Sequence, residues 1–396
     1  MCAKLDIYKN IVGVGNFDSL ESETINFLRF PLIVLVIYIH AFGEPLNTDF
    51  SADYIIYDHI RIFFSHILSR VAVPWFYLIS GYLFFKGVVC FDKNTYFRKL
   101  RSRTITVLVP YLSWNILLIM RVVIMNIIRG ITQQNYDTWG AIWMFFDKNG
   151  WLDMFWSCRE WPFRVSWFGW SLPSSGPIFL PMWFLRDLIV AFLLSYIIYK
   201  AIRLFGEVFI VVVVFCSISG LWPNIPGISD TCLSWFSMGA YMAINKKNMI
   251  AEFSRYSEMI FASALFLMLL MVIFKSDFTS IGGYIYPLFT LAGVPAMFLL
   301  ASLIILASPS FKNPAILVRA SFFVYACHTF LVLDFMSCIV RWMIPDTNGF
   351  FMILRYLLTP LLCAIVCLGL YYIMEKYMPC ITGVLTGNRN RKNRKK

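Results

Sequence analysis

The sequence has little charge. Only 14% of its 396 residues are charged and 59% are hydrophobic, against about 25% and about 45–50% in an average soluble domain. A soluble surface cannot be built from so few charges, and the same composition excludes a disordered chain and a collagen-like fibre. The composition is that of a polytopic membrane protein, in which each spanning helix takes about 20 mostly apolar residues.

Patterns typical of metal, redox and export segments are also missing. The ten cysteines form no CxxC pair, which argues against a disulfide framework and a zinc site. His59 and His66 share one face of an amphipathic stretch but have no third ligand nearby, so no metal is predicted. No Gly-rich phosphate loop is present. Asp6, Glu21 and Glu23 precede the first apolar run without a small-residue cleavage site, which predicts an uncleaved helix.

Long apolar runs are abundant, and they predict the fold class. We predict an all-α, polytopic transmembrane helix bundle of about ten spanning helices, forming one integral-membrane domain over residues 1–378. The fifth and sixth segments are the shortest. The ten segments cover residues 27–43, 71–90, 104–128, 183–204, 207–222, 231–245, 256–274, 284–307, 321–344 and 350–374.

The surplus of positive charge lies in two short stretches. The chain has 34 basic and 22 acidic residues, a net charge of +12. Residues 86–103 carry +5 and residues 376–396 carry +7, so the rest of the chain is balanced. Basic loops stay on the cytoplasmic side, which predicts two cytoplasmic termini, a basic cytoplasmic tail at 379–396 and an outer loop at about 130–182. The tail is expected to contact lipid headgroups, and no nucleic-acid partner is predicted.

Two ionisable residues interrupt the first apolar segment, LRFPLIVLVIYIHAF. Arg29 and His40 are 11 residues apart, which places them on one helical face about 16 Å apart along the axis. An ionisable residue inside a membrane helix is costly and is a functional candidate by default. A neutral imidazole is a natural general base for a hydroxyl. The alternative is a snorkelling arginine and a hydrogen-bonded packing histidine.

Six motifs in order carry a resemblance to a known family. The R-x10-H pair resembles the hallmark of the acyltransferase-3 family of integral-membrane O-acyltransferases, and the other five motifs resemble that family's later helices. The match covers residues about 25–335 and looks closest to fucose-4-O-acetylase-like and surface-polysaccharide acetyltransferases. The five later motifs are RVAVPWFYLISGYLFF (70–85), FRKLRSRTITVLVPYLSW (97–114), PMWFLRDLIV (181–190), WFSMGAYMA (235–243) and SFFVYACHTFLV (321–332).

The resemblance implies an enzyme of the bacterial cytoplasmic (inner) membrane. It would move an acyl group, by family frequency acetyl, from cytoplasmic acyl-CoA to a hydroxyl of an envelope or surface glycan. Acyl-CoA would be a co-substrate, with no tightly bound cofactor. His40 would act as the catalytic base or a transient acyl carrier, and Arg29 would orient the donor or stabilise negative charge. The alternative is a transporter or flippase of lipid-linked glycan, but Asp187, Asp334 and Glu375 lie toward helix ends rather than at a midplane pair.

Three arginines of the loop after the second segment are candidates for binding the CoA phosphates. Arg98 and Arg101 have the family's RxxR spacing, and residues three apart on a helix share a face and can clamp one phosphate. Arg103 matches the family's last arginine equally well, because that arginine lies a few residues before the proline of the motif, here Pro110. The alternative is that these arginines only signal topology.

Six further residues are candidates for the acceptor site or the acyl tunnel. Each has a plainer alternative. Arg70 would be an interfacial anchor, and Trp183 would belong to a belt of tryptophans at the membrane interface. Arg186 and Asp187 would be helix caps, and Tyr325 and His328 would form an interhelical hydrogen bond. The outer loop with its flanking tryptophan carries eight of the thirteen tryptophans, which favours it for acceptor specificity. The acceptor's identity and the oligomeric state, a homo-oligomer included, stay open. The six residues are Arg70, Trp183, Arg186, Asp187, Tyr325 and His328.

Overall fold

The structure is a computed structural model of the chain. It describes residues 17–42, 52–165, 168, 171–222, 225–274, 281–308, 314–345 and 347–388. The predicted cytoplasmic N-terminus and residues 389–396 of the predicted basic tail lie outside the described residues.

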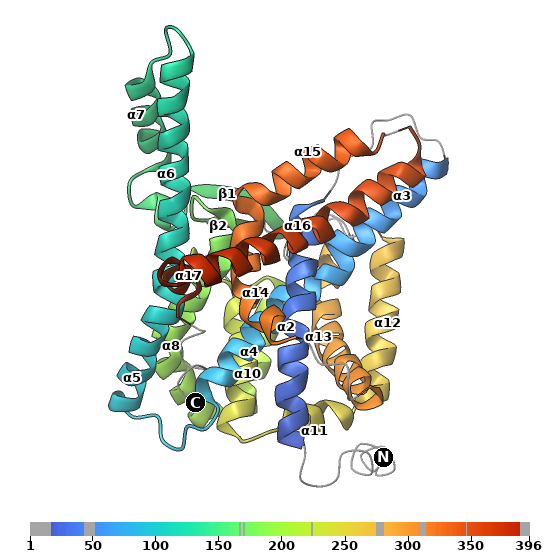
Figure 1. Ribbon diagram of the computed structural model, residues 1–396. Coiled ribbons are helices and arrows are strands. Elements are labelled where there is room, and N and C mark those ends of the chain that lie inside the picture. Colours follow the sequence, from blue (N-terminus) through green and yellow to red (C-terminus); the bar gives the residue numbers. More distant parts are fainter. Residues whose placement is uncertain are drawn as a thin grey trace.

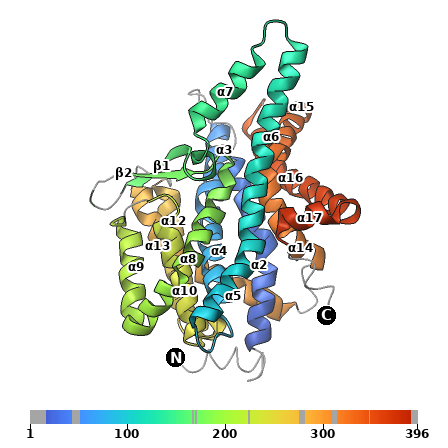
Figure 2. The same ribbon diagram turned by 90° about the vertical axis from the view of Figure 1, so that its left-hand side faces the viewer.

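The described chain is a bundle of helices with one small hairpin of strands (Figures 1 and 2). Each of the ten predicted apolar segments coincides with a helix. In chain order the helices are α2 (Phe17–His40), α3 (Ala52–Ile62), α4 (Ala72–Phe85), α5 (Lys93–Arg103), α6 (Val109–Thr132), α7 (Thr138–Asn149), α8 (Trp183–Phe205), α9 (Glu207–Ser219), α10 (Asp230–Ile244), α11 (Met249–Ser254), α12 (Ser257–Ile273), α13 (Ile281–Ala307), α14 (Ala315–Cys327), α15 (Leu333–Met343), α16 (Gly349–Tyr377) and α17 (Pro379–Thr386).

Seven helical stretches within the described residues are long and apolar enough to cross a membrane. The apolar helices α9 and α12 are shorter, with 13 and 17 residues. The prediction of an all-α polytopic membrane bundle is therefore confirmed, while the number of spans and the side of each terminus stay predictions. The seven stretches are Phe17–His40, Tyr54–Phe85, Lys93–Thr132, Leu180–Phe205, Gly283–Ala307, Ala315–Met343 and Gly349–Tyr377.

Several of these stretches are longer than their apolar runs because π-helical turns join neighbouring helices. The π-helix η1 (Phe63–Ile67), followed by the 3-10 turn η2 (Leu68–Val71), connects α3 to α4. The π-helix η3 (Thr104–Leu108) connects α5 to α6, and η6 (His328–Val332) connects α14 to α15. Single π-helical turns occur often at functional sites, and two of these three contain a histidine.

The predicted outer loop at 130–182 has more structure than its sequence indicates. It contains the end of α6, all of α7 and an antiparallel pair of strands, β1 (Arg159–Val165) and β2 (Ser171–Gly176). Arg159 pairs with Gly176 and Val165 with Ser171. The 3-10 turns η4 (Asp153–Phe155) and η5 (Leu180–Met182) flank the hairpin. The α6–α7 pair projects beyond the rest of the bundle (Figures 1 and 2).

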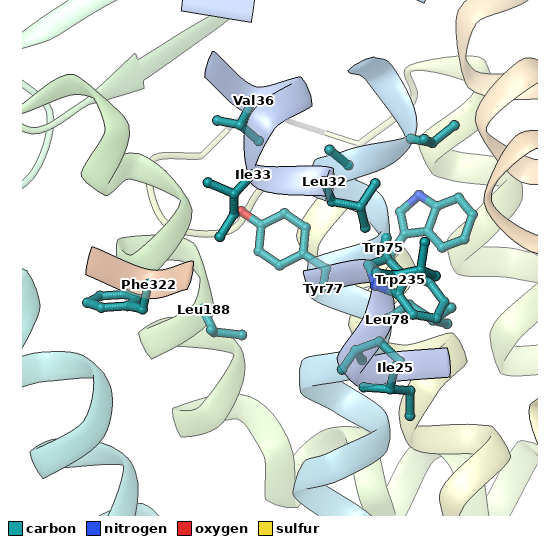
Figure 3. Packing of buried hydrophobic residues seen from close by; sticks show 14 of the residues in the cluster. Ile25, Leu32, Ile33, Val36, Trp75, Tyr77, Leu78, Leu188, Trp235 and Phe322 are labelled. Carbon is teal, nitrogen blue, oxygen red and sulfur yellow. The ribbon is translucent and has the colours of Figure 1, made fainter. Parts of the chain in front are cut away.

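The core of the bundle surrounds α2 and α4 (Figure 3). Large apolar side chains of five helices pack there, and Leu32 and Trp75 are each 1% exposed. The exposed apolar side chains lie on the outer faces, as expected for a bundle whose solvent is lipid. The labelled members of the core in Figure 3 are Ile25, Leu32, Ile33 and Val36 of α2, Trp75, Tyr77 and Leu78 of α4, Leu188 of α8, Trp235 of α10 and Phe322 of α14.

Helices α4 and α10 approach each other through two glycines. A Cβ atom at Gly81 would lie 2.0 Å from the Phe236 carbonyl oxygen, and one at Gly239 would lie 1.9 Å from the Leu78 carbonyl oxygen. Small residues are what allow membrane helices to pack this closely. Gly81 and Gly239 therefore allow the backbones of α4 and α10 to pack closely.

Alanine at either glycine should force the two helices apart. We expect Gly81→Ala and Gly239→Ala each to destabilise the protein by about 1–3 kcal/mol, the usual cost of overpacking. The matched control is Gly369→Ala on α16, where a Cβ meets nothing within 4 Å. Thermal unfolding in detergent measures all three variants. Equal midpoints for Gly81→Ala and Gly369→Ala would contradict the close-packing role.

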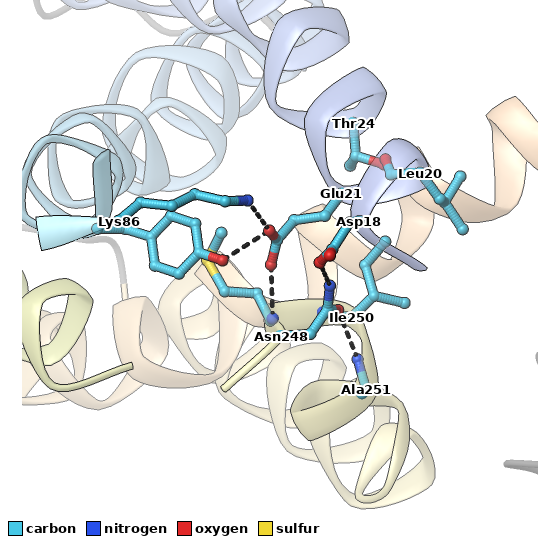
Figure 4. A network of polar contacts seen from close by, with 10 residues as sticks. Asp18, Leu20, Glu21, Thr24, Lys86, Asn248, Ile250 and Ala251 are labelled. Carbon is cyan, nitrogen blue, oxygen red and sulfur yellow. Dashed lines mark hydrogen bonds and ion pairs between the residues drawn. The ribbon is translucent and has the colours of Figure 1, made fainter. Parts of the chain in front are cut away.

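A buried carboxylate fixes the start of α2 (Figure 4). Glu21 is fully buried, and it accepts hydrogen bonds from the Tyr82 hydroxyl at 2.6 Å, the Lys86 ammonium at 2.8 Å and the Met249 backbone N–H at 2.8 Å. Asn248 caps α11 and donates to Asp18 at 3.2 Å. The carboxylate therefore links α2 to the end of α4 and to α11.

The predicted boundary at residue 378 falls between α16 and α17. Helix α17 packs back on α6, where the Trp114 indole N–H donates to the Leu385 carbonyl at 3.1 Å, and Leu385 is buried. The first residues of the segment predicted as a tail are thus a packed helix.

Candidate active site

Three cavities surround the last three turns of α2. The basic cavity, of about 400 Å³, has Arg29, Arg103 and Arg319 in its lining. The central cavity, of about 280 Å³, is lined by His40, Arg70, Trp183 and other residues. The side cavity, of about 360 Å³, lies against α3, α15 and α16, and His40 is part of its lining too.

The basic and central cavities are neighbours, and the residues that line both are here called the neck. The residues lining both are Val36, Val73, Phe184 and Tyr325. One face of α2 runs along both cavities, with Arg29 in the basic cavity and His40 in the central cavity. The two residues are about 16 Å apart along the axis, and the neck residues lie at the border of the two cavities.

A hydrogen-bonded network holds the end of α2 that carries His40. The Ser65 hydroxyl donates to the Tyr38 carbonyl at 2.6 Å and lies 2.7 Å from the Tyr356 hydroxyl. The Tyr38 hydroxyl donates to the Leu357 carbonyl at 3.0 Å. These contacts join α2, the π-helix η1 and α16, so three elements fix the backbone two residues before His40.

His328 lies behind His40. The two ring centroids are 5.1 Å apart, and His328 is fully buried at the first position of the π-helix η6. Its Nδ1 is 2.6 Å from the Tyr325 carbonyl oxygen, and because a carbonyl only accepts, Nδ1 carries the proton. Its Nε2 has no hydrogen-bond partner among the described residues. His328 therefore packs against the His40 ring, with its buried Nε2 not engaged by another described residue.

Of the three loop arginines predicted to bind the CoA phosphates, one lines the basic cavity and two do not. Arg103 is half-buried, lies 5.1 Å from the Phe192 ring centroid and lines the cavity. Arg98 and Arg101 are exposed on α5 and do not belong to that lining. Arg319, exposed on α14, lines the same cavity.

The central cavity brings together three residues of the predicted acceptor or tunnel set. Arg70 lines it and is 2.8 Å from Nδ1 of His66. Trp183 and Tyr325 line it as well, and the Tyr325 hydroxyl donates to the Pro181 carbonyl. This hydrogen bond ties α14 to η5, the turn directly before α8, beside the neck.

Arg186 and Asp187 form a buried pair beside Ser229, a residue that lines the central cavity. They are 3% and 1% exposed, and Arg186 Nε donates to Asp187 Oδ1 at 2.9 Å. Arg186 also donates to the Trp156 carbonyl at 2.6 Å. Within the described residues they line none of the three cavities, and their contacts fix α8 to the segment before β1.

The chemistry available here is that of proton transfer and anion binding. Three arginines line one cavity, and a histidine with a second histidine against it lines the neighbouring one. Such an arrangement binds an anionic group at one end and removes a proton at the other. Among the described residues, no three His, Cys, Asp or Glu side chains are grouped to hold a metal ion.

Comparison with known protein families decides the class of the enzyme. The family model described as an acyltransferase domain, that of the acyltransferase-3 family, matches residues 23–374. The chain belongs to the acyltransferase-3 family. The predictions of a multi-pass membrane protein and of an acyltransferase that transfers groups other than aminoacyl groups are therefore confirmed.

One relative of this acyltransferase-3 chain matches over nearly its full length. The succinoglycan biosynthesis protein ExoH of Rhizobium meliloti (strain 1021) is 27% identical over 387 residues, which are 94% of each chain. No solved structure matches the chain.

Sequence reasoning missed Arg319 and the side cavity of this acyltransferase. Sequence analysis gave Arg319 no role, because it lies two residues before the ninth apolar segment, although helix α14 begins earlier and includes it. Asp334, Ser337 and Arg341 line the side cavity and recur at helical spacing, a pattern that predicts one polar face.

Proposed function

We propose that this membrane acyltransferase moves an acyl group, acetyl in the simplest case, from acyl-CoA to a hydroxyl of an envelope or surface glycan. The observation that carries the proposal is that the arginine-lined basic cavity and the cavity lined by His40 adjoin along one face of α2. The glycan acceptor is supported by the name of ExoH, a succinoglycan biosynthesis protein. The basic charge near α5 supports a bacterial cytoplasmic membrane with the basic cavity open to the cytoplasm.

The donor would enter at the basic cavity. Arg103 and Arg319 line its wall from α5 and α14, and arginine binds phosphate through charge-assisted, often paired, hydrogen bonds. The pantetheine arm would then pass Arg29 and the neck at Tyr325, which brings the thioester to His40. Arg98 and Arg101, exposed on the same helix as Arg103, would contact the nucleotide end of CoA from outside the cavity.

His40 would act as the general base. Its imidazole takes the proton from the acceptor hydroxyl, the hydroxyl oxygen bonds to the thioester carbon, and the carbon–sulfur bond breaks. The proton then passes from His40 to the CoA thiolate, so the products are an O-acyl ester and free CoA. His328, against the His40 ring, would position that ring.

Removing the cavity arginines should weaken donor binding selectively. We expect the double variant Arg103→Met and Arg319→Met to raise the KM for acyl-CoA by about 10- to 100-fold, because each hydrogen bond to a charged group contributes about 1.5–3 kcal/mol. The KM for the acceptor should stay unchanged. Initial rates with purified protein in liposomes give both constants.

The matched control is Arg98→Gln with Arg101→Gln, a pair on the same helix that does not line the cavity. A smaller rise in the donor KM is expected for the control pair. An equal or larger rise would place the phosphates on the exposed face of α5 and contradict entry through the cavity.

The alternative of a glycan transporter would be favoured if a deletion strain accumulated lipid-linked glycan inside the cell and lost no acyl ester.

A further inference from the structure

The side cavity meets His40 from a different set of helices than the donor route does. Its lining shares one described residue, His40, with the central cavity and none with the basic cavity. The donor route lies among α2, α4, α8 and α14, whereas the side cavity lies among α3, α15 and α16. His40 is therefore the point at which two otherwise separate spaces meet.

The side cavity is polar on its α15 wall. Asp334, Ser337 and Arg341 line it, and their spacing of three and four residues places them on one helical face. Arg341 is held by the Ser337 hydroxyl at 2.8 Å. Asp334 is exposed and has no ion-pair partner among the described residues.

The other walls are aromatic and firmly held. Tyr57 and Tyr356 line the cavity, with ring centroids 6.4 Å apart. Arg355 of α16 donates to the Ile344 carbonyl at 2.6 Å and to the Arg341 carbonyl at 3.2 Å, which secures the end of α15. Acidic and basic side chains together with aromatic rings are groups that bind sugar hydroxyls and the apolar faces of sugar rings.

We propose that the side cavity is the acceptor site and that its ligand is a saccharide whose hydroxyl reaches His40 from the α15 side. This inference rests on the proposed O-acyltransferase function. The volume of about 360 Å³ is within the range of small-molecule sites. The charged lining disfavours an acyl chain, and the central cavity on the far side of His40 belongs to the donor route. Acceptor specificity then resides in α15 and α16 rather than in the tryptophan-rich loop.

The α15 helix also suits an acceptor delivered from the bilayer. Beside the cavity wall, α15 carries Phe335 and Trp342, which are 62% and 87% exposed, and Leu331 of η6 is 47% exposed. A saccharide attached to a lipid and a soluble glycan segment offer the same hydroxyl chemistry to the cavity, so the source is decided by experiment.

The first experiment measures the two Michaelis constants separately. Protein in liposomes is assayed with acyl-CoA and with saccharide released from the surface glycan of a deletion strain. Asp334→Asn and Arg341→Gln are expected to raise the acceptor KM at least tenfold and to leave the acyl-CoA KM unchanged. The control Phe335→Ala, next to Asp334 but outside the cavity lining, should leave both constants unchanged.

Two results would overturn the assignment. The first is an acceptor KM of Asp334→Asn and Arg341→Gln equal to that of the wild type. The second is a rise in the acceptor KM of Trp183→Phe, which alters the central cavity, in place of a rise in the side-cavity variants. Failure of the proposed function is distinguishable, because the wild-type protein itself would then form no acyl ester.

The second experiment uses Cys338, an exposed cysteine that lines the side cavity. We expect saccharide to protect Cys338 from alkylation, with CoA giving no protection, while exposed Cys90 and Cys380 react at unchanged rates as internal references. Water-soluble saccharide fragments and butanol-extracted lipid-linked saccharide are the two probes. Stronger protection by the lipid-linked probe assigns the source to the bilayer. No protection of Cys338 by either probe would contradict the acceptor site.

Discussion

Replacement of His40 by alanine is expected to lower kcat for acyl transfer by about 10²- to 10⁴-fold, the usual contribution of a positioned general base. His40 is the described residue that lines both the central and the side cavity, so no neighbouring group replaces it at the meeting point. The buried His328 ring lies against it but lines neither cavity. The protein should still fold, because the hydrogen bonds that hold the end of α2 come from Tyr38 and Ser65.

The variant is measured with acyl-CoA and saccharide in liposomes, after its amount in the membrane has been matched to the wild type. His59→Ala is the control, since His59 is exposed on α3 and bonds only within its own helix among the described contacts, through the Ile55 carbonyl. The control should retain wild-type kcat. Retention of full kcat by His40→Ala would show that the reacting proton is removed elsewhere.

The second large effect concerns stability. Glu21→Ala is expected to destabilise the protein by about 3–5 kcal/mol, as when one partner of a buried charged network is removed. The substitution leaves the Tyr82 hydroxyl and the Met249 N–H without their acceptor, and it disconnects α2 from α4 and α11. Unfolding of the purified protein in detergent, followed by loss of helical signal with increasing denaturant, measures the change.

Glu23→Ala is the matched control, because Glu23 is exposed two residues farther along the same helix. A change within about 0.5 kcal/mol is expected for a surface substitution of this kind. If Glu21→Ala were no less stable than Glu23→Ala, the buried network would not hold the start of α2.

Much of the fold follows from the sequence because a membrane helix must satisfy its own backbone hydrogen bonds. A run of about 20 apolar residues therefore predicts α2, α8 and α16 directly. The amphipathic α3 was not joined to the second segment, since its charges hide that the helix continues through a π-helical turn. The strands β1 and β2 lie in a tryptophan-rich loop without the alternating pattern that predicts strands.

The candidate site was predictable where it lies on one helix. The 11-residue spacing of Arg29 and His40 places both on one face, and that face lines the joined cavities. Arg103 was not distinguishable from Arg98, because only the packing of α5 against Phe192 turns Arg103 inward. The side cavity was not predictable, since α3 lines it together with α15 and α16, which lie far from α3 in the chain.

The most direct test of the account is mass spectrometry of the surface glycan. A strain that lacks this protein is complemented with the wild type, with His40→Ala or with His59→Ala, and O-acyl groups on the glycan are quantified. The account predicts O-acylation with the wild type and His59→Ala, and none with the deletion or His40→Ala. Unchanged O-acylation in the deletion strain, or full O-acylation with His40→Ala, would contradict it.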